Sequence, residues 1–386
     1  MSETKEDLQM QLNCFSEYCD TWKLKVNTSK TKVLIFSKGR QPNNINFIYE
    51  ENEIEIVKEF NYLGLLLTRS GSFNKAKKRL SEKATKAMYN VIKKGRQCNL
   101  SIECQLELFD KLVKPILLYG CEVWGFGKND IIEQVHLKFL KHLLHLKRST
   151  PSMIVYGETG RYPLEISIKC RMITYWCRLL IDENKLSSIL YKFVYSRYHT
   201  NNDDILWIKN IKNILDNAGF SNLFYVQNTD LTKWLPKSIK LRLIDQFKQI
   251  WNSAIQNTSK CITYRLFKEH FEFENYFNII NDRDIYTLCK FRTSNHSLPI
   301  EKGRWHNIDR SDRKCSICTK RDIGDEYHYI FVCPALQDER RRFIPNGLIP
   351  RHNIFTFNKL FNSKKPKTLR NLCNFIRCIN SKLTPS

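Results

Sequence analysis

Apolar residues at helical spacing dominate the start of the chain. Thr4 and Asp7 fit a capping box, in which side chains satisfy free backbone N–H groups at the beginning of a helix. Side chains three or four positions apart share one helix face. The pattern therefore predicts an opening amphipathic helix whose apolar positions are Leu8, Leu12, Phe15, Tyr18, Cys19 and Trp22.

Shorter apolar segments follow, with the length and residue types of β-strands. Residues 33–36 are predicted to form a buried strand. Residues 46–49 and 53–57 flank a Glu50-Glu51-Asn52 turn, which favours a hairpin. Residues 60–67 are expected to form a further strand.

The charge pattern changes sharply at residues 69–96. Ten basic residues stand there against one acidic residue, Glu82, and a narrow apolar stripe recurs at helical spacing. A face that only keeps a helix soluble usually mixes both signs of charge. We therefore expect a basic helix with apolar positions at Ala76, Leu80, Ala84, Ala87, Met88 and Val91.

The rest of the chain has mainly helical patterns. A helix is expected over residues 103–118, interrupted by Pro115, and another over residues 130–146, with apolar positions at Ile131, Val135, Phe139 and Leu143. Segment 291–313 has a loop-like, basic composition. Further helical patterns cover residues 163–181, 205–218, 238–255 and the tail beyond Pro334.

These patterns together predict an α+β fold that is mainly helical, with no membrane-spanning segment. The longest apolar runs, 63–67 and 115–119, are far shorter than the roughly 18 residues a membrane helix needs. We expect four regions: 1–68 with a small antiparallel sheet, 69–160 with the basic helix, a helical linker over 161–306, and 307–386 with a cysteine-rich segment and a helical tail.

The overall charge favours a polyanionic partner. The chain has 63 Lys and Arg against 39 Asp and Glu, a formal net charge of +24. Nucleic acid fits this excess better than an anionic membrane surface. Residues 1–7 are charged and carry no apolar signal region. The fourteen cysteines are therefore expected to be reduced thiols, in the nucleus or the cytoplasm.

Three cysteines and one histidine have the spacing of a zinc site. Cys315, Cys318, His328 and Cys333 form the pattern C-x2-C-x9-H-x4-C. Zinc takes four sulfur or nitrogen donors at tetrahedral corners, and a C-x2-C turn presents two thiolates to one point. The pattern predicts a closed, structural Zn2+ site, against the alternative of four unrelated buried residues. The other cysteines are interpreted as core thiols, among them Cys14, Cys19, Cys98, Cys104, Cys373 and Cys378.

Basic and aromatic residues surround these ligands. Cations would contact phosphates, and rings would either stack on unpaired bases or form the small core of the zinc segment. Both interpretations of the rings stay open. The basic residues are Arg310, Arg313, Lys314, Lys320, Arg321, Arg340, Arg341 and Arg342, and the rings are Tyr327, Tyr329 and Phe331.

Several segments resemble the reverse transcriptases of LINE-class (non-LTR) retrotransposons. Residues 22–36, WKLKVNTSKTKVLIF, and 60–64, FNYLG, are similar to the last motifs of the palm of these enzymes. Residues 117–125, LLYGCEVWG, resemble the thumb region. Residues 292–305, RTSNHSLPIEKGRW, together with the zinc ligands, resemble the C-terminal cysteine-rich segment. The resemblance spans most of the chain, although residues 193–286 contribute little to it.

The resemblance also exposes a missing part. In such enzymes an aromatic-x-Asp-Asp motif, whose carboxylates hold Mg2+ for phosphoryl transfer, lies just before the segment that residues 2–8 resemble. That motif is absent here. The adjacent Asp203 and Asp204 stand in a polar break, where a helix cap is expected instead. We therefore expect a truncated or decayed element, or a piece of a longer polyprotein that also carries the palm and an endonuclease.

The resemblance implies candidate nucleic-acid contacts. Either Lys30 or Lys32 would occupy the position of a lysine near the phosphates of the incoming nucleotide. Tyr62 and Gly64 would belong to the primer grip, although an ordinary strand and turn is the alternative. The basic helix would be the first thumb helix. Its expected contacts, and those near the zinc segment, are Lys75, Lys78, Arg79, Lys83, Lys86, Arg304, Arg340, Arg341 and Arg342.

Three functions follow as hypotheses. The first is sequence-tolerant binding of RNA or primer–template, without polymerase activity of its own. The second is an RNA-directed DNA polymerase completed by a separate palm. Primer extension by the purified chain with Mg2+ would distinguish this hypothesis from the first. The third is a zinc-held protein-interaction module, whose partner binding would be insensitive to excess RNA.

Overall fold

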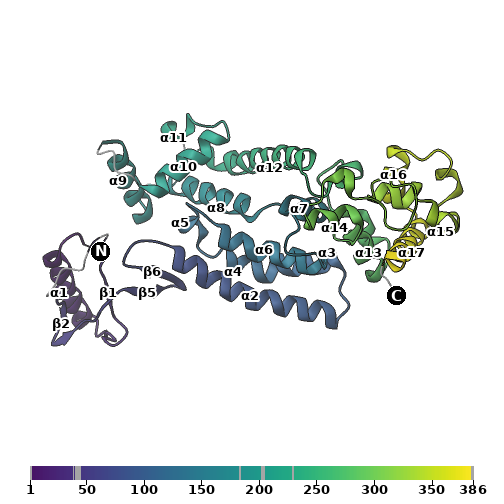
Figure 1. Ribbon diagram of the computed structural model, residues 1–386. Coiled ribbons are helices and arrows are strands. Elements are labelled where there is room, and N and C mark those ends of the chain that lie inside the picture. Colours follow the sequence, from purple (N-terminus) through teal and green to yellow (C-terminus); the bar gives the residue numbers. More distant parts are fainter. Residues whose placement is uncertain are drawn as a thin grey trace. The chain divides into compact units, whose positions relative to one another are not determined.

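The computed structural model describes residues 2–37, 39, 45–181, 184–200, 205–227 and 230–383 (Figure 1). These residues are mostly helical, with a few short strands, in agreement with the predicted mainly helical α+β class. Contacts divide the chain into two compact units. Unit 1 comprises residues 1–84 and 116–120, and unit 2 comprises residues 85–115 and 121–386. The finer division into four regions stays a prediction.

Unit 1 opens with the predicted helix α1 (Lys5–Thr21). The Thr4 side chain accepts a hydrogen bond from the Asp7 N–H at 3.1 Å, which caps the helix as the sequence suggested. The Gln9 amide bonds both the N–H and the carbonyl of Ile48, so α1 is fixed against strand β2 (Ile48–Tyr49). Their shared core consists of Val33, Phe47, Tyr49 and Ile54, with Leu8 and Leu12 packed against it.

The strands of unit 1 differ in part from the predicted ones. β2 pairs antiparallel with β3 (Asn52–Glu53) across a turn at Glu50 and Glu51. Residues 56–57 leave this hairpin, because β4 (Ile56–Val57) pairs in parallel with β1 (Val33–Leu34). The single strand expected over 60–67 is wrong, since β5 (Glu59–Tyr62) and β6 (Leu65–Thr68) form a hairpin.

Helix α2 (Asn74–Gln97) is the predicted basic helix, and it begins five residues later than the charge pattern suggested. Arg69 is still bound to the sheet region through its N–H and the carbonyl of Lys58, and Gly71 adopts a positive φ of 68°. The helix therefore starts only after this turn. Its apolar stripe is buried as expected at Ala76, Leu80, Ala84, Met88 and Val91.

The expected interruption at Pro115 takes the form of a wider helical turn. α3 (Ile102–Leu108) is followed by a π-helical turn, η1 (Phe109–Val113), and then by α4 (Lys114–Leu117). Proline donates no N–H and its ring crowds the preceding turn. The Lys114 N–H bonds the carbonyl of Phe109, five residues back, so the chain stays helical with a changed repeat.

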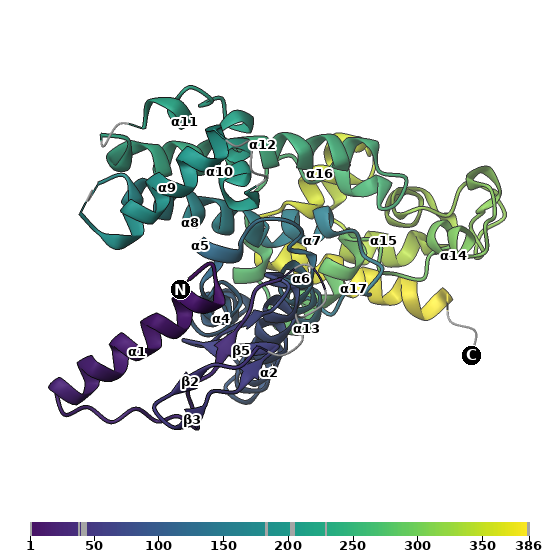
Figure 2. The same cartoon turned by 90° about the vertical axis from the view of Figure 1, so that its left-hand side faces the viewer.

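Unit 2 is built from packed helices. α8 (Leu164–Leu179) lies alongside α12 (Leu231–Asn257), and both views of the molecule show the pair (Figures 1 and 2). α7 (Ser152–Thr159) also packs on α12, where Gly157 allows close approach because a Cβ at that position would meet the Trp251 indole at 2.7 Å. The remaining longer helices are α6 (Asp130–Leu143), α9 (Leu186–Thr200), α10 (Leu206–Asn217), α13 (Asp282–Arg292), α16 (Ile354–Phe361) and α17 (Pro366–Leu383).

A buried ion network joins distant parts of unit 2. The guanidinium of Arg292 and the carboxylate of Glu158 are both fully buried, and their Nε and Oε1 atoms are 2.7 Å apart. The hydroxyls of Tyr276 and Tyr264 also donate to Glu158, at 2.7 and 2.9 Å. Glu274 pairs with Arg292 Nη2 at 2.9 Å. Because each charge has its partners, burial of this network is tolerated.

Segment 291–313 is more ordered than its composition suggested. Helix α13 extends to Arg292, and α14 (Pro299–Trp305) begins with Pro299, whose fixed φ suits the first helical turn. None of the described helices is long and apolar enough to cross a membrane. Asp203 and Asp204, for which a helix cap was expected, lie outside the described residues.

Candidate metal centre and nucleic-acid contacts

The four predicted zinc ligands converge in unit 2. The donor atoms of Cys315, Cys318, His328 and Cys333 all lie within 4.8 Å of one another. The sulfurs of Cys315 and Cys333 are 3.9 Å apart, and Cys318 Sγ is 3.5 Å from His328 Nε2. Zinc–sulfur bonds of about 2.3 Å at tetrahedral angles place two sulfurs roughly 3.8 Å apart. The donor set therefore fits a tetrahedral metal ion.

Short backbone contacts hold the ligands in place. The Cys315 N–H bonds the carbonyl of Asp322 at 2.9 Å, and the Gly324 N–H bonds that of Arg313 at 2.8 Å, which closes a narrow loop around the C-x2-C turn. A Cβ on Gly324 would meet the Cys315 backbone at 3.1 Å, so glycine makes this close approach possible without a shift of the neighbouring backbone. The His328 N–H donates to Asp325 Oδ1 at 2.9 Å, which orients the histidine-bearing turn.

The surroundings of the Cys315 thiol stabilise negative charge, whereas burial raises the pKa of Cys318 and raises that of Cys333 to about 12. Burial raises the pKa of the Cys315 thiol, but hydrogen bonds, first that from the Tyr329 hydroxyl, outweigh burial and hold the pKa below its ordinary value. The distance from this hydroxyl to Cys315 Sγ is 3.4 Å. A metal ion would bind these groups as thiolates, and four protein donors leave no position for a reacting water. The site is compatible with a structural zinc ion.

The aromatic residues around the ligands mostly belong to the core of this segment. Tyr329 and Phe331 are buried, so their rings are not available to bases. Phe331 stacks on the His352 imidazole with ring centroids 5.5 Å apart, and it also contacts Phe357 of α16. Tyr327 is half-buried and its hydroxyl bonds His352 Nδ1 at 2.9 Å. Of the two interpretations of these rings, the structure favours the small core.

The three consecutive arginines of α15 (Gln337–Phe343) have different environments. Arg340 is buried, and its guanidinium donates to the carbonyls of Ile330 and Cys333 at 2.8 and 2.7 Å. It braces the backbone at a ligand, so a contact with nucleic acid is not its role in this structure. Arg341 and Arg342 are exposed.

In unit 1 the candidate primer grip is the tight turn between β5 and β6. Leu63 and Gly64 have positive φ angles of 47° and 86°, as a two-residue type I′ hairpin turn requires. The Tyr119 hydroxyl donates to the Leu63 carbonyl at 2.6 Å and fixes the turn from one side. Tyr62 is 58% exposed beside it. The turn therefore presents backbone and an aromatic ring at a surface.

The two candidate lysines before this hairpin differ. Lys32 Nζ lies 2.7 Å from the Glu55 carboxylate, so its charge has a partner. The Lys30 side chain is exposed, and among the described residues its ammonium has no ion pair. Of the two, Lys30 is better placed to meet a phosphate.

The five predicted cations of α2 are all exposed. Lys75, Lys78, Arg79, Lys83 and Lys86 lie outside the buried stripe, although Lys75 also contacts Glu59. Lys77 is buried on the apolar side, and burial lowers its pKa. The helix thus separates an apolar face from a cationic face.

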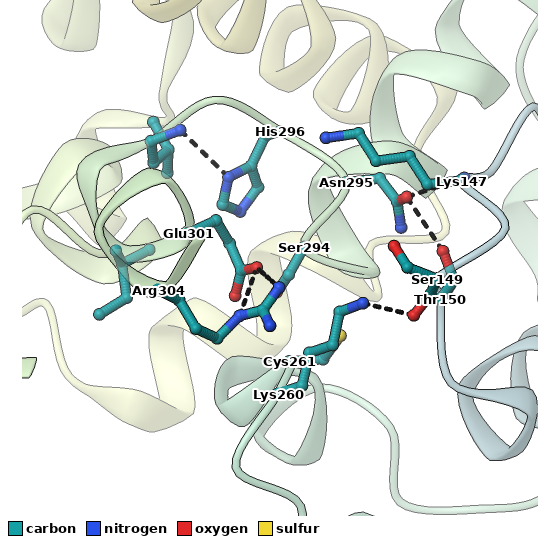
Figure 3. A network of polar contacts seen from close by, with 12 residues as sticks. Lys147, Ser149, Thr150, Lys260, Cys261, Ser294, Asn295, His296, Glu301 and Arg304 are labelled. Carbon is teal, nitrogen blue, oxygen red and sulfur yellow. Dashed lines mark hydrogen bonds and ion pairs between the residues drawn. The ribbon is translucent and has the colours of Figure 1, made fainter. Parts of the chain in front are cut away.

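A further group of cations was not found from the sequence. Lys147 and Lys260 lie near Arg304, the one candidate that the sequence suggested here, and Figure 3 shows all three around the same loops. Arg304 donates twice to the buried Glu301, at 2.8 and 3.1 Å. Over a hundred positions separate Lys147 from Lys260, so no local motif signals their convergence.

Comparison with known proteins finds one informative similarity. Over 125 residues the chain is 27% identical to a probable RNA-directed DNA polymerase from transposon X-element of Drosophila melanogaster. The aligned part covers 31% of this chain and 13% of that polymerase, so the chain spans a small share of its relative. No family model matches the chain, and no solved structure is significantly similar. The chain is therefore a distant relative, over part of its length, of LINE-type reverse transcriptases.

Proposed function

We propose that this chain is the nucleic-acid-gripping part of a LINE-type reverse transcriptase. It binds RNA or a primer–template duplex through the sugar–phosphate backbone, with little dependence on sequence. The chain contains no aromatic-x-Asp-Asp motif to hold Mg2+, so polymerisation falls to a palm outside it. The distant relation to a transposon polymerase supports this proposal.

The cationic face of α2 is the observation that carries the proposal. Its five exposed cations recur at the helical repeat between Lys75 and Lys86 and so form one stripe. Eleven residues of helix span about 16 Å, a length that reaches several phosphates of a duplex. Glu82 is the one acidic residue of the helix, so the stripe is poorly neutralised from within.

Other parts of the chain add to this grip. The turn at Leu63 and Gly64 lets the backbone approach a primer end closely, and Lys30 would meet phosphates nearby in unit 1. In unit 2 a structural zinc ion would hold the C-terminal segment folded, with Arg341 and Arg342 exposed on it. The zinc stabilises the fold of this segment and takes no part in bond breaking.

Removal of charge from α2 tests the proposal. The triple variant Lys78→Gln/Arg79→Gln/Lys83→Gln should bind an RNA–DNA duplex roughly tenfold or more weakly in moderate salt, because three phosphate contacts are lost. The plot of log affinity against log salt should become shallower by roughly 2 to 3. Fluorescence anisotropy with a labelled duplex measures both quantities.

A matched variant controls for net charge. Lys237, Arg242 and Lys248 are exposed on α12, and their replacement by glutamine removes the same charge elsewhere in the chain. Affinity should change little in this variant. Equal losses in the two variants would show that only the net charge matters, and the assigned role of α2 would be wrong.

A further inference from the structure

A second basic surface in unit 2 surrounds Trp305, at the end of α14. The indole of Trp305 is 45% exposed, and the Lys147 ammonium lies 4.0 Å from its ring centroid. Lys147 comes from the loop after α6, Lys260 from the loop after α12, and Arg304 from α14 itself (Figure 3). Three segments that are far apart in sequence thus bring cations near one another, and one of these cations, Lys147, lies on the exposed ring.

Hydrogen bonds between the loops fix this arrangement. The Asn295 Oδ1 atom accepts from the Lys147 N–H and from the Thr150 hydroxyl, each at 3.0 Å. The Lys260 ammonium bonds the carbonyl of Ser149, as Figure 3 shows. The loop that carries Asn295 is itself held by the contact of His296 with the buried Glu326 at 2.8 Å. The cations are therefore presented by a braced framework.

Glu301 is the acidic group that acts on these cations, and its ion pair is with Arg304. Glu301 is buried, and Arg304 donates to it. Burial, followed by the positive charge of Arg304, lowers the pKa of Lys260. Burial also lowers the pKa of Lys147, and the charges of Arg304 and Lys290 lower it further, although Glu301 opposes them. Ammonium groups that repel one another are stabilised when an anion binds between them.

A pocket next to this surface has the same charge. Its volume is about 360 Å³, within the range of roughly 300 to 1,000 Å³ that small-molecule sites occupy. Lys290, Lys302 and Arg377 line it together with Asn295, which also holds the Lys147 loop. Among the described residues that line the pocket there is no acidic side chain, although Arg377 pairs with Asp284 behind it.

The surface connects to the C-terminal end of α2 within unit 2. Arg96, at the end of α2, lies 3.4 Å from His142 Nε2, and the rings of His142 and His145 are 6.5 Å apart. Burial lowers the pKa of His145, and the positive charges of Lys290 and Arg96 lower it further. Positive groups therefore continue from α2 to the pocket.

From these contacts we propose that the Trp305 site, formed by Lys147, Lys260, Lys290, Lys302, Arg304 and Trp305, binds an unpaired stretch of RNA or DNA. Backbone phosphates lie on the lysines, and one base stacks on the exposed part of the indole. A duplex hides the faces of its bases, whereas a single strand offers them to an aromatic ring. This inference rests on the proposed function and adds to it a site for a single strand within unit 2.

Two variants test the site, each measured against a labelled single strand and a labelled duplex. Trp305→Leu should weaken binding of the single strand roughly 5- to 150-fold, the equivalent of one lost stacking contact, and should leave duplex affinity within about twofold. Lys147→Gln/Lys260→Gln should make the salt dependence of single-strand binding shallower by about 1.4. Lys237→Gln/Lys248→Gln, on α12, is the matched control for charge.

A photocrosslinking experiment on the unaltered chain tests the same site independently. A single strand carrying photoreactive 5-iodouracil should crosslink to Trp305 upon irradiation, as located by mass spectrometry of the peptide that contains it. Unchanged single-strand affinity in Trp305→Leu, equal loss for strand and duplex, or crosslinks only elsewhere would overturn this site while the α2 proposal stands. Failure of the unaltered chain to bind any nucleic acid would instead reject the proposed function itself.

Discussion

His328 illustrates how a single ligand is oriented in the candidate metal centre. Its Nε2 atom faces Cys318 Sγ, and its Nδ1 atom lies 3.6 Å from the Asp322 carboxylate. In the part of the chain that the structure describes, Nδ1 has no hydrogen-bond partner. A carboxylate on the far nitrogen of a ligating histidine fixes its tautomer and strengthens it as a ligand. The Asp322 carboxylate lies beside the far nitrogen of this candidate ligand without a hydrogen bond to it.

Replacement of one cysteine tests whether the four residues bind a metal ion or only lie together by chance. We expect Cys318→Ser to weaken zinc binding by more than the roughly 10- to 100-fold that loss of an outer partner costs. Because metal binding and local folding are coupled, the C-terminal segment should also become sensitive to proteolysis. Zinc content per chain and limited digestion measure these effects.

The interpretation of Cys14, Cys98 and Cys104 as core thiols is wrong, because all three are exposed. Cys14→Ser therefore serves as the comparison, since Cys14 is also remote in sequence from the ligands. It should keep the zinc content of the unaltered chain. Full zinc content in Cys318→Ser would show that the ligand set is wrong.

At the residue scale the sequence predicts what local spacing encodes. The four ligands come within 18 positions, and a short loop suffices to bring them together. Arg340 looked like its neighbours because a run of arginines does not reveal which side chain turns inward. Lys147 and Trp305 meet only through the packing of separate helices, which no local pattern encodes.

Among the helices of unit 2, the Glu133 carboxylate ties three together. It belongs to α6 and accepts from the Tyr156 hydroxyl of α7 at 2.7 Å and from the Leu164 N–H of α8 at 2.6 Å. His136 lies 2.8 Å away on the same helix. Burial raises the pKa of Glu133, but the hydrogen bonds, first that with His136, outweigh it and hold the pKa below its ordinary value.

This lowered pKa predicts an acid-dependent loss of stability. The contribution of Glu133 is complete above its ordinary pKa of 4.5 and disappears as the pH falls through the lowered value in the folded chain. At neutral pH, Glu133→Gln should lower the free energy of unfolding by about 1 to 3 kcal/mol. In strong acid the two proteins should become nearly equal. Urea unfolding at both pH values measures the difference, and an equal difference at both would contradict the assignment.

Helical elements were easier to predict than the strands. The apolar stripe of α2 repeats over roughly four turns between Ala76 and Val91, so its period identifies the helix even though the helix begins later than predicted. The segment 60–67 is mostly apolar, and a single glycine, Gly64, is the only sequence signal of the turn that divides it into two strands. The parallel pair of β1 and β4 depends on contacts between residues over twenty positions apart.

At the scale of the whole molecule, the excess of 63 basic over 39 acidic residues is unevenly spread along the chain. In unit 1 it includes Lys30 and the first turns of α2, and in unit 2 the end of α2 and the Trp305 site. Such a distribution attracts a polyanion over long range and holds it by many weak contacts. The predicted class of fold, the basic helix and the four candidate zinc ligands came from the sequence, whereas the convergence of Lys147, Lys260 and Arg304 required the structure.

The affinity of the unaltered chain for an RNA–DNA duplex as a function of salt is the most direct test of this account. If the five exposed cations of α2 contact phosphates, each releases counterions, and log affinity should fall against log salt with a slope of roughly −4 or steeper. Fluorescence anisotropy over a series of salt concentrations gives this slope. A dissociation constant that stays the same across the series would contradict the account.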